Sequence, residues 1–516
     1  MNWKLLILCG IWCLGVGCTR QDPAVTVMPT RMSLVEMPTI EEGGSEMDVV
    51  APTVSPTVGL GVAVAEKVYI GTPTPDPTRP VIIEGVDNYQ IHTVQAGETL
   101  GIIAGLYGST VEDLMLINQL EAADYLSVGQ ALLVPGGAAL VTPSFKLVPD
   151  SELVYGPSYK DFSVGAVANY YGGYLVGYEE VVEGQLLSGV EIVELVAMRF
   201  RVGPRVLLAA LEYRGGWVTT AGVVEPNYPL GYVQAGSEGL YRQLGWAANQ
   251  LNLGYYGRAE GGRPTMMLAD GTRIAYALDI NDGTAGVQAF LGASNQGGYQ
   301  GWLFDAGDAG WYGTYTRLFG NPFSYTYEPL WPREMTQPYL ALPWAEGETW
   351  YFTGGPHGGW AGGSAWAALD FVDGSEYLGC YETTSWVTAM ADGRVVWSDF
   401  GGVLVDLDGD GYAGTGWTIF YMHLATEGRV AVGTEVRVGD RLGRPSCEGG
   451  FSNGSHVHVA RLYNGRWISA DGRVPFIMGG WVSQGLGGEY DGILVRGEVV
   501  KEACECRAEI NGILHD

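Results

Sequence analysis

The chain has 516 residues, which is too long for one ordinary domain and suggests about three. Its 28 basic and 57 acidic residues give a net charge of −29, so it lacks the basic surplus that would bind nucleic acid or adsorb to an anionic membrane. Charged residues are only 16% and hydrophobic residues 47%, which excludes a charged disordered chain, and the 79 glycines follow no Gly-X-Y period, which excludes collagen. With 16 Trp and 30 Tyr, this composition favours glycine-turned, aromatic-rich extracytoplasmic domains.

The N-terminal segment MNWKLLILCGIWCLGVG has the features of a signal peptide. Lys4 precedes an apolar stretch too short to span a bilayer as a permanent helix, and small residues follow up to Cys18. Small residues directly before a cysteine resemble a bacterial lipobox, although Gly15 stands where that pattern prefers leucine. The resemblance implies a signal peptide over 1–18 and a lipid on Cys18, which would anchor the protein to the cell membrane or outer membrane, facing the cell wall. Cleavage of an ordinary signal peptide nearby is the alternative.

Residues 19–88 are predicted to form a linker. The stretches PTVSPTVG and GTPTPDPTRP are rich in proline and threonine, and no hydrophobic period is sustained between them. A long spacer of this kind suits an anchored protein whose working parts must reach the wall.

Residues 89–136 predict a compact βααβ unit. YQIHTVQ alternates like a strand, TLGIIAGLYG and TVEDLMLINQL have helical character, and LSVGQALLVPG supplies a second strand. In order and sequence this unit resembles a LysM domain, a family that binds N-acetylglucosamine-containing glycans, chiefly peptidoglycan or chitin. The resemblance implies a glycan groove lined by the turns at Gly97, Glu98, Thr99, Leu100, Leu126, Ser127, Val128 and Gly129. We interpret His92 as a partly exposed strand histidine without a role in binding.

Residues 150–335 are predicted to form a mainly α-helical domain. Ser188 and Glu191 make a capping box, and Pro204 suits the first turn of the next helix. A third helix is predicted within EGLYRQLGWAANQLN. The segment LLAALEYRGGWV weakly resembles the surroundings of the catalytic glutamate in lysozyme-like transglycosylases and glucosaminidases, which would make Glu212 a general acid. Tyr213 departs from the Ser or Thr of that pattern, so we favour a helical spacer or a substrate-positioning domain.

Four of the six histidines lie between residues 357 and 458. Residues i and i+2 of a strand point to the same face, so the pair His456 and His458 aims two imidazoles at one point. With His357, Asp370 and His423 nearby in sequence, these side chains could bind a catalytic zinc ion through three protein ligands and leave one position open for water.

The order His, Asp, His, His-x-His resembles the lysostaphin-like (LytM-type) zinc metallopeptidases over about 350–475, within a domain predicted at 345–480. The spacing of GGPHGGW from Asp370 is similar to the LasA-type, beta-lytic branch. The resemblance implies an all-β, antiparallel domain that binds Zn²⁺ through His357, Asp370 and His458. It implies that His423 and His456 are catalytic histidines, one acting as base toward water and the other hydrogen-bonding the oxyanion. No H-E-x-x-H sequence occurs, which excludes thermolysin-like chemistry.

These resemblances imply a cell-wall zinc endopeptidase that hydrolyses peptide bonds of peptidoglycan and is targeted by a LysM domain. The alternative is a degenerate, non-catalytic LytM-type lipoprotein that binds peptidoglycan and activates another wall hydrolase. Because all five expected side chains are present, we favour the enzyme.

Four cysteines remain after the signal segment and the lipidation candidate, and four cysteines allow three pairings. We favour Cys380–Cys447, which would brace the segments flanking the site, together with Cys504–Cys506.

Three further expectations concern the C-terminal third. WVTAM, ADG and RVVWSDF predict a β-hairpin that turns at Asp392 and Gly393. Residues 406–411 invite a calcium interpretation, but Trp417 stands where an EF-hand loop has glutamate, so we favour a polar hairpin loop. Residues 481–516 are expected to be a C-terminal tail.

Overall fold

The computed structural model describes residues 89–95, 97–107, 109, 111–118, 120, 126–135, 140–223, 225–260, 263–375, 379–381 and 383–516. The predicted signal peptide, the lipidation site Cys18 and the linker over 19–88 lie outside these residues. Among the described residues, no helix combines the length and apolar character that crossing a bilayer requires.

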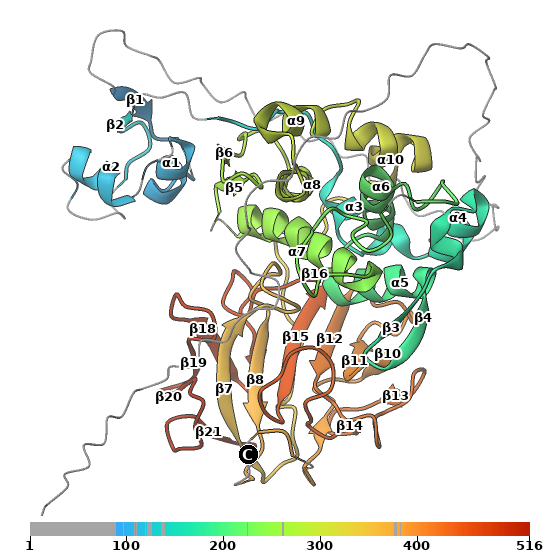
Figure 1. The fold of residues 1–516 in the computed structure, drawn as a ribbon. Helices are drawn as coiled ribbons and strands as arrows, with labels where there is room; N and C mark the ends of the chain where they lie inside the picture. Colours follow the sequence, from blue (N-terminus) through green and yellow to red (C-terminus); the bar gives the residue numbers. More distant parts are fainter. Residues whose placement is uncertain are drawn as a thin grey trace, which may run out of the picture. The chain divides into compact units, whose positions relative to one another are not determined.

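The N-terminal unit has the predicted βααβ order (Figure 1). Its elements are β1 (Tyr89–Thr93), α1 (Leu100–Leu106), α2 (Val111–Asn118) and β2 (Ala131–Pro135). The two strands pair antiparallel, and α1 begins where the Thr99 hydroxyl accepts the backbone N–H of Ile102. The Asn118 side chain binds both the N–H and the C=O of Leu133, so it ties α2 to the edge of β2.

His92 differs from our interpretation, because it is buried in this unit. Only 8% of the residue is exposed, and its Nε2 lies 2.8 Å from a carboxylate oxygen of Glu98. Its Nδ1 lies 3.1 Å from the hydroxyl of Tyr107. The strand histidine therefore joins the first turn to α1 from inside the unit.

The middle region is mainly helical, as predicted. Its elements are α3 (Asp150–Leu153), η1 (Pro157–Tyr159), α4 (Val164–Tyr171), η2 (Tyr174–Gly177), β3 (Glu179–Val182), β4 (Gln185–Ser188), α5 (Gly189–Phe200), α6 (Pro204–Gly215), α7 (Leu240–Ala259), β5 (Thr265–Met267), β6 (Arg273–Ala275), α8 (Asp282–Ala293), α9 (Gly298–Asp305), α10 (Trp311–Phe319) and η3 (Pro322–Tyr325). The capping box of Ser188 and Glu191 is present at the start of α5, and Pro204 is the first residue of α6. Helix α7 runs further than predicted, because Tyr255 and Tyr256 are buried in the core.

The C-terminal region is antiparallel sheet. The main sheet follows the order β13-β10-β11-β12-β15-β8-β7-β21, and β16 also pairs with β15 (Figure 1). Its strands are β7 (Thr349–His357), β8 (Ala368–Val372), β10 (Gly393–Asp399), β11 (Gly402–Asp406), β12 (Trp417–Met422), β13 (Glu435–Val436), β15 (Val457–Tyr463), β16 (Arg466–Trp467) and β21 (Gly512–Leu514). A two-stranded sheet pairs β9 (Val387–Thr388) with β14 (Arg441–Gly443). A four-stranded sheet holds β17 (Ile477–Met478), β18 (Trp481–Gly485), β19 (Gly492–Arg496) and β20 (Val499–Glu502).

The hairpin predicted around Asp392 and Gly393 is wrong. β9 pairs with β14, and β10 pairs with β11 across a turn at Phe400 and Gly401. Both turn residues have positive φ, 43° and 73°, the backbone conformation that suits a two-residue hairpin turn. Alternation alone does not distinguish the two pairings.

Residues 481–516 are not an independent tail. They carry β18, β19 and β20, and β21 pairs antiparallel with β7. Within them, the Cys504–Cys506 disulfide forms as favoured, and Cys380 is bonded to Cys447 as favoured. Strand β21 therefore belongs to the sheet that carries His357, and β18, β19 and β20 belong to the separate four-stranded sheet.

The main sheet has two buried faces. Leu369, Tyr421 and Val459 point into a core between the sheet and the C-terminal strands. The alternate residues Ala368, Phe420 and Ala460 belong to one continuous core with the helices of the middle region. In strands β8 and β15, the side chains of Asp370 and His458 alternate with the first set, so the candidate site lies on the helix-covered face.

Candidate metal centre

Neighbouring strands bring His357, Asp370 and His458 together. Asp370 lies opposite His458 in the β8–β15 ladder, and His357 is the last residue of β7. The β7–β8 register shifts between Gly354 and His357, which carries the histidine toward the carboxylate. Gly354 is required here, because a Cβ at this position would lie 2.8 Å from Asp370 Oδ2.

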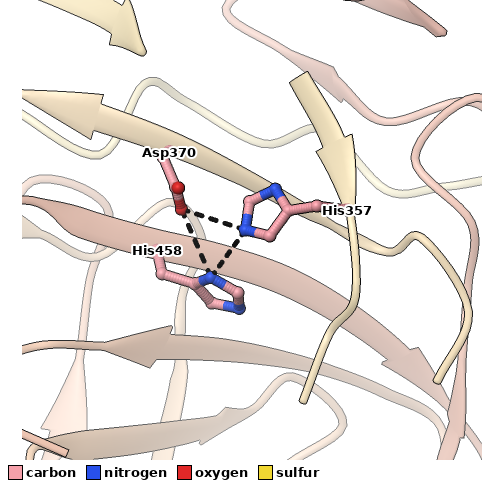
Figure 2. Close-up of side chains that lie close together, drawn as sticks. All are labelled: His357, Asp370 and His458. Atoms are coloured by element: carbon pink, nitrogen blue, oxygen red, sulfur yellow. Dashed lines mark hydrogen bonds and ion pairs between the residues drawn. The ribbon is translucent and has the colours of Figure 1, made fainter. Parts of the chain in front are cut away.

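The three side chains point at one another from these strands (Figure 2). His357 Nε2 lies 3.0 Å from His458 Nδ1 and 3.2 Å from Asp370 Oδ1, and His458 Nδ1 lies 3.3 Å from the same oxygen. Ligand atoms about 2.0–2.1 Å from a tetrahedral zinc ion are about 3.3 Å apart, so the triangle has the dimensions of a zinc site.

The hydrogen bonds of the two imidazoles show which ring nitrogens are donors and which are acceptors. His357 Nδ1 lies 2.8 Å from the carbonyl of Gly355, and His458 Nε2 lies 3.1 Å from the carbonyl of Gly359, so both nitrogens are donors. In the neutral imidazoles, the facing nitrogens are then acceptors, and Asp370 Oδ1 is buried without a hydrogen-bond donor. Three acceptors meet at one point, and a cation there would satisfy all of them.

The pKa shifts within the buried cluster bear on the charge of its carboxylate. Burial by itself raises the pKa of Asp370, but His357 and His456 nearby outweigh burial and hold that pKa well below its usual range. Burial lowers the pKa of His458, while at His357 the neighbouring Asp370 outweighs burial and raises the pKa. The carboxylate is therefore ionised and available as a metal ligand.

His423 and His456 lie beside the triangle, with ring centroids 4.4 Å apart. His423 Nδ1 lies 2.9 Å from the carbonyl of Glu448, and His456 Nδ1 lies 2.8 Å from the carbonyl of Gly454. In its neutral form, each ring therefore carries its proton on Nδ1 and presents Nε2 as an acceptor. Burial, followed by His456 and His458, lowers the pKa of His423 well below its usual range, so His423 is neutral.

Sequence reasoning missed Tyr490. Its ring stacks on His357, with centroids 4.2 Å apart and an angle of 20° between the planes. Backbone hydrogen bonds join Tyr490 to Gly355 and Pro356, on the segment that ends in the candidate metal ligand His357. The residue lies in the segment that we expected to be a tail, 32 positions after His458, and no local pattern marks it.

The middle region covers the face that carries the site. Trp360, three residues after His357, packs against Phe200 of α5, and the Arg199 guanidinium lies 4.7 Å from the Trp360 ring centre. The backbone N–H of Gly363 donates to the side chain of Asn249 in α7 at 2.8 Å. The five clustered residues are accordingly 2–8% exposed.

Glu212 has a structural explanation. Its carboxylate accepts the backbone N–H groups of Val218 and Thr219 and the Thr219 hydroxyl, at 2.9, 3.1 and 2.6 Å. The residue is 9% exposed. These bonds secure the turn that follows α6 and occupy the carboxylate that a general acid would use.

The two turns of the predicted glycan groove lie next to each other. The N–H of Gly129 donates to the carbonyl of Val94, just before the first turn. Val128 is 70% exposed, but Leu100 is buried in the core and the Glu98 carboxylate bonds His92. Leu100 and the Glu98 carboxylate, which we predicted to line the groove, are therefore not available at its surface.

The acidic loop at 406–411 forms its own hydrogen bonds. Asp406 accepts the N–H groups of Asp408 and Gly411, and Asp410 pairs with Lys160 at 2.7 Å. The carboxylates of Asp406, Asp408 and Asp410 also have oxygens within 4.8 Å of one another, so the choice between a polar turn and a calcium site stays a prediction.

Comparisons with known proteins agree with these observations. Residues 92–135 match the family described as LysM domain, and residues 146–332 match the family described as LasA, N-terminal domain. The chain is similar to LasA-type metallopeptidases. The middle region therefore matches the LasA N-terminal domain. This family differs from the lysozyme-like enzymes that the segment around Glu212 weakly resembles.

The curated relatives include two proteins named Protease LasA, from two strains of Pseudomonas aeruginosa. Each is 25% identical over 292 residues, which is 53% of this chain and 66% of the relative, so the chain spans just under two thirds of their length. Solved structures include the deep-sea M23 metalloprotease pseudoalterin, with 27% identity, 33% of this chain and 96% of that chain covered, and a TM-score of 0.27. The catalytic domain of lysostaphin from Staphylococcus simulans has 24% identity, covers 24% and 89% of the two chains, and has a TM-score of 0.17.

Proposed function

We propose that the protein is a zinc endopeptidase that hydrolyses peptide bonds of peptidoglycan. The observation that carries the proposal is the acceptor triangle of His357, Asp370 and His458 with two further histidines beside it. A site built only for structure would be closed by a fourth protein ligand, whereas three ligands and adjacent acid–base groups suit catalysis.

A zinc ion held by these three ligands would polarise the scissile carbonyl and lower the pKa of a bound water. The chain's own groups supply the proton transfers. A neutral histidine, His423 or His456, can take a proton from water at Nε2, since its Nδ1 proton is engaged by a backbone carbonyl. The resulting imidazolium can donate an Nε2–H to the oxyanion or to the leaving amine.

The LysM domain supports peptidoglycan as the substrate. Its glycan-binding turns would raise the local concentration of wall peptides around the peptidase region. Lipid attachment at Cys18 would add a membrane anchor, and with a net charge of −29 the protein does not depend on charge to hold an anionic wall.

The test is digestion of defined peptidoglycans by the purified full-length protein, with mass analysis of the released fragments. We expect new amino and carboxyl termini within the peptide part and a bound zinc ion. The variant His458→Ala should lose both, whereas His515→Ala, a histidine near the C-terminus and outside the cluster, should keep both. A protein that binds wall glycan but holds no zinc and cuts nothing would instead support the alternative, a non-catalytic activator of another wall hydrolase.

A further inference from the structure

His423 has a backbone conformation that needs support. It follows the last residue of β12 and has φ of 64°, in the left-handed region that residues with a side chain rarely adopt. Because its imidazole is 2% exposed and beside the metal centre, a small backbone change would move the ring out of place.

Residues 446–448 form hydrogen bonds with both the backbone carbonyl and the imidazole ring of His423. The backbone N–H and the hydroxyl of Ser446 both donate to the His423 carbonyl, at 2.6 and 3.0 Å. Two residues later, the Glu448 carbonyl accepts from His423 Nδ1 at 2.9 Å. One short segment therefore contacts the backbone and the side chain of His423.

The segment is itself anchored on three sides. Cys447, between the two contacting residues, is disulfide-bonded to Cys380, 67 residues earlier. The Glu448 carboxylate accepts the N–H of Thr426 at 2.9 Å and the Thr426 hydroxyl at 2.6 Å. Gly401 makes room for the carbonyl, since a Cβ there would lie 2.5 Å from Glu448 O.

We propose that residues 446–448 form a clamp that positions His423 beside the metal centre and fixes its proton on Nδ1, so that Nε2 remains an acceptor. Ser446 and Glu448 are positioning residues, because they act through His423. The role of His423 as base rests on the proposed function, but the clamp and the tautomer do not.

The tautomer has a direct spectroscopic signature. Imidazoles in water favour the proton on Nε2, and nitrogen chemical shifts distinguish the two forms. In the full-length protein labelled with ¹⁵N-histidine, we expect His423 to carry its proton on Nδ1. The double variant Ser446→Ala/Glu448→Ala keeps the Glu448 backbone carbonyl but removes the Ser446 hydroxyl and the Glu448 carboxylate that hold the segment in place. With the carbonyl no longer held against Nδ1, part of the Nε2-protonated form should become populated. A wild-type His423 protonated on Nε2 would overturn the proposal.

Kinetics give a second readout. We expect the double variant to lower kcat on a peptidoglycan fragment by about 10-fold to 100-fold, with KM and zinc content unchanged, because substrate and metal contacts remain. Ser446→Thr and Glu448→Gln should restore most of the rate, since each keeps an oxygen for its partner. The matched control is Glu427→Ala, which changes an exposed glutamate next to Thr426, and its kcat should equal that of wild type.

If the double variant is poorly folded, the single variants and the pair Cys380→Ser/Cys447→Ser carry the test, each with a smaller fall in kcat. Wild-type kcat in every clamp variant would overturn the proposal. A wild-type protein without activity but with the Nδ1 proton would refute the proposed function and support the clamp.

Discussion

The variant Asp370→Asn tests whether a buried carboxylate holds a cation at the candidate metal centre. The substitution removes one negative charge and hardly changes the volume of the side chain. Asp370 Oδ1 lies 3.2 and 3.3 Å from the facing nitrogens of His357 and His458 and has no donor of its own. An amide group in its place can donate an N–H to one of those nitrogens. In the metal-free variant, this hydrogen bond would satisfy an acceptor that a bound cation satisfies in the native protein.

The size of the effect follows from the number of ligands. Zinc bound by four protein ligands in small domains contributes about 10–16 kcal/mol, so one ligand is worth about 3 kcal/mol. Losing that much corresponds to a rise in Kd of about 100-fold. Because the amide satisfies the imidazoles, we expect the thermal midpoint of the metal-free variant to stay at or above that of metal-free wild type.

The assay is competition for zinc against a chelating indicator, with metal content of the dialysed full-length protein measured by mass spectrometry. The matched control is Asp373→Asn, three residues further along the chain. That carboxylate is equally buried, but its partners are the hydroxyls of Tyr381 and Thr383. The control should bind zinc as wild type does.

A zinc affinity of Asp370→Asn within about 3-fold of wild type would refute the reasoning, because the carboxylate would then not be a ligand. So would equal losses in both variants, since the effect would come from general damage to the strand.

Three further predictions concern other parts of the chain. In Glu152→Ala the free energy of unfolding should fall by about 4 kcal/mol in chemical denaturation, because the buried Arg205 guanidinium loses its bidentate carboxylate partner. Burial, helped by Asp408, raises the pKa of Asp406 to about 6, so the folded state holds this proton more tightly than the unfolded chain. Stability should therefore fall as the pH rises from about 4 to about 6, and thermal melts of Asp406→Asn should lack this slope. Val128→Asp should weaken binding to N-acetylglucosamine oligomers at least about 10-fold in calorimetry, because Val128 is exposed in the second LysM turn.

Each of these has an outcome that contradicts it. A loss below about 1 kcal/mol in Glu152→Ala, no larger than that of the exposed-pair control Lys160→Ala, would show that the buried pair is unimportant. An Asp406→Asn variant with the pH slope of wild type would assign that slope to other groups. Unchanged glycan binding in Val128→Asp would place the groove elsewhere on the LysM domain.

Much of the architecture could be predicted because its signals are local. The capping box at Ser188, the proline at the start of α6 and the alternation of β12 depend only on nearby residues. Strand pairing depends on distant residues, and for that reason the hairpin around Asp392 was predicted wrongly. The same limit applies to the C-terminal strand β21, whose pairing with β7 leaves no mark in the sequence.

The sequence by itself determined which chemistry is available at the candidate site. Histidines at i and i+2 and an aspartate in a strand are a local pattern, and a strand projects such residues to one face whatever its neighbours are. The spacing of His456 and His458 therefore indicated a metal site, and the resemblance to a peptidase family implied the other three side chains.

Only the tertiary structure decided how these side chains are held. Ring tautomers depend on backbone carbonyls such as those of Gly359 and Glu448, which come close through chain segments far apart in sequence. The stacking of Tyr490 on His357 and the packing of α5 against Trp360 likewise arise from long-range contacts. The residue types at the site are given by the sequence, whereas the direction in which each imidazole nitrogen points its lone pair is set by contacts that exist only in the folded protein.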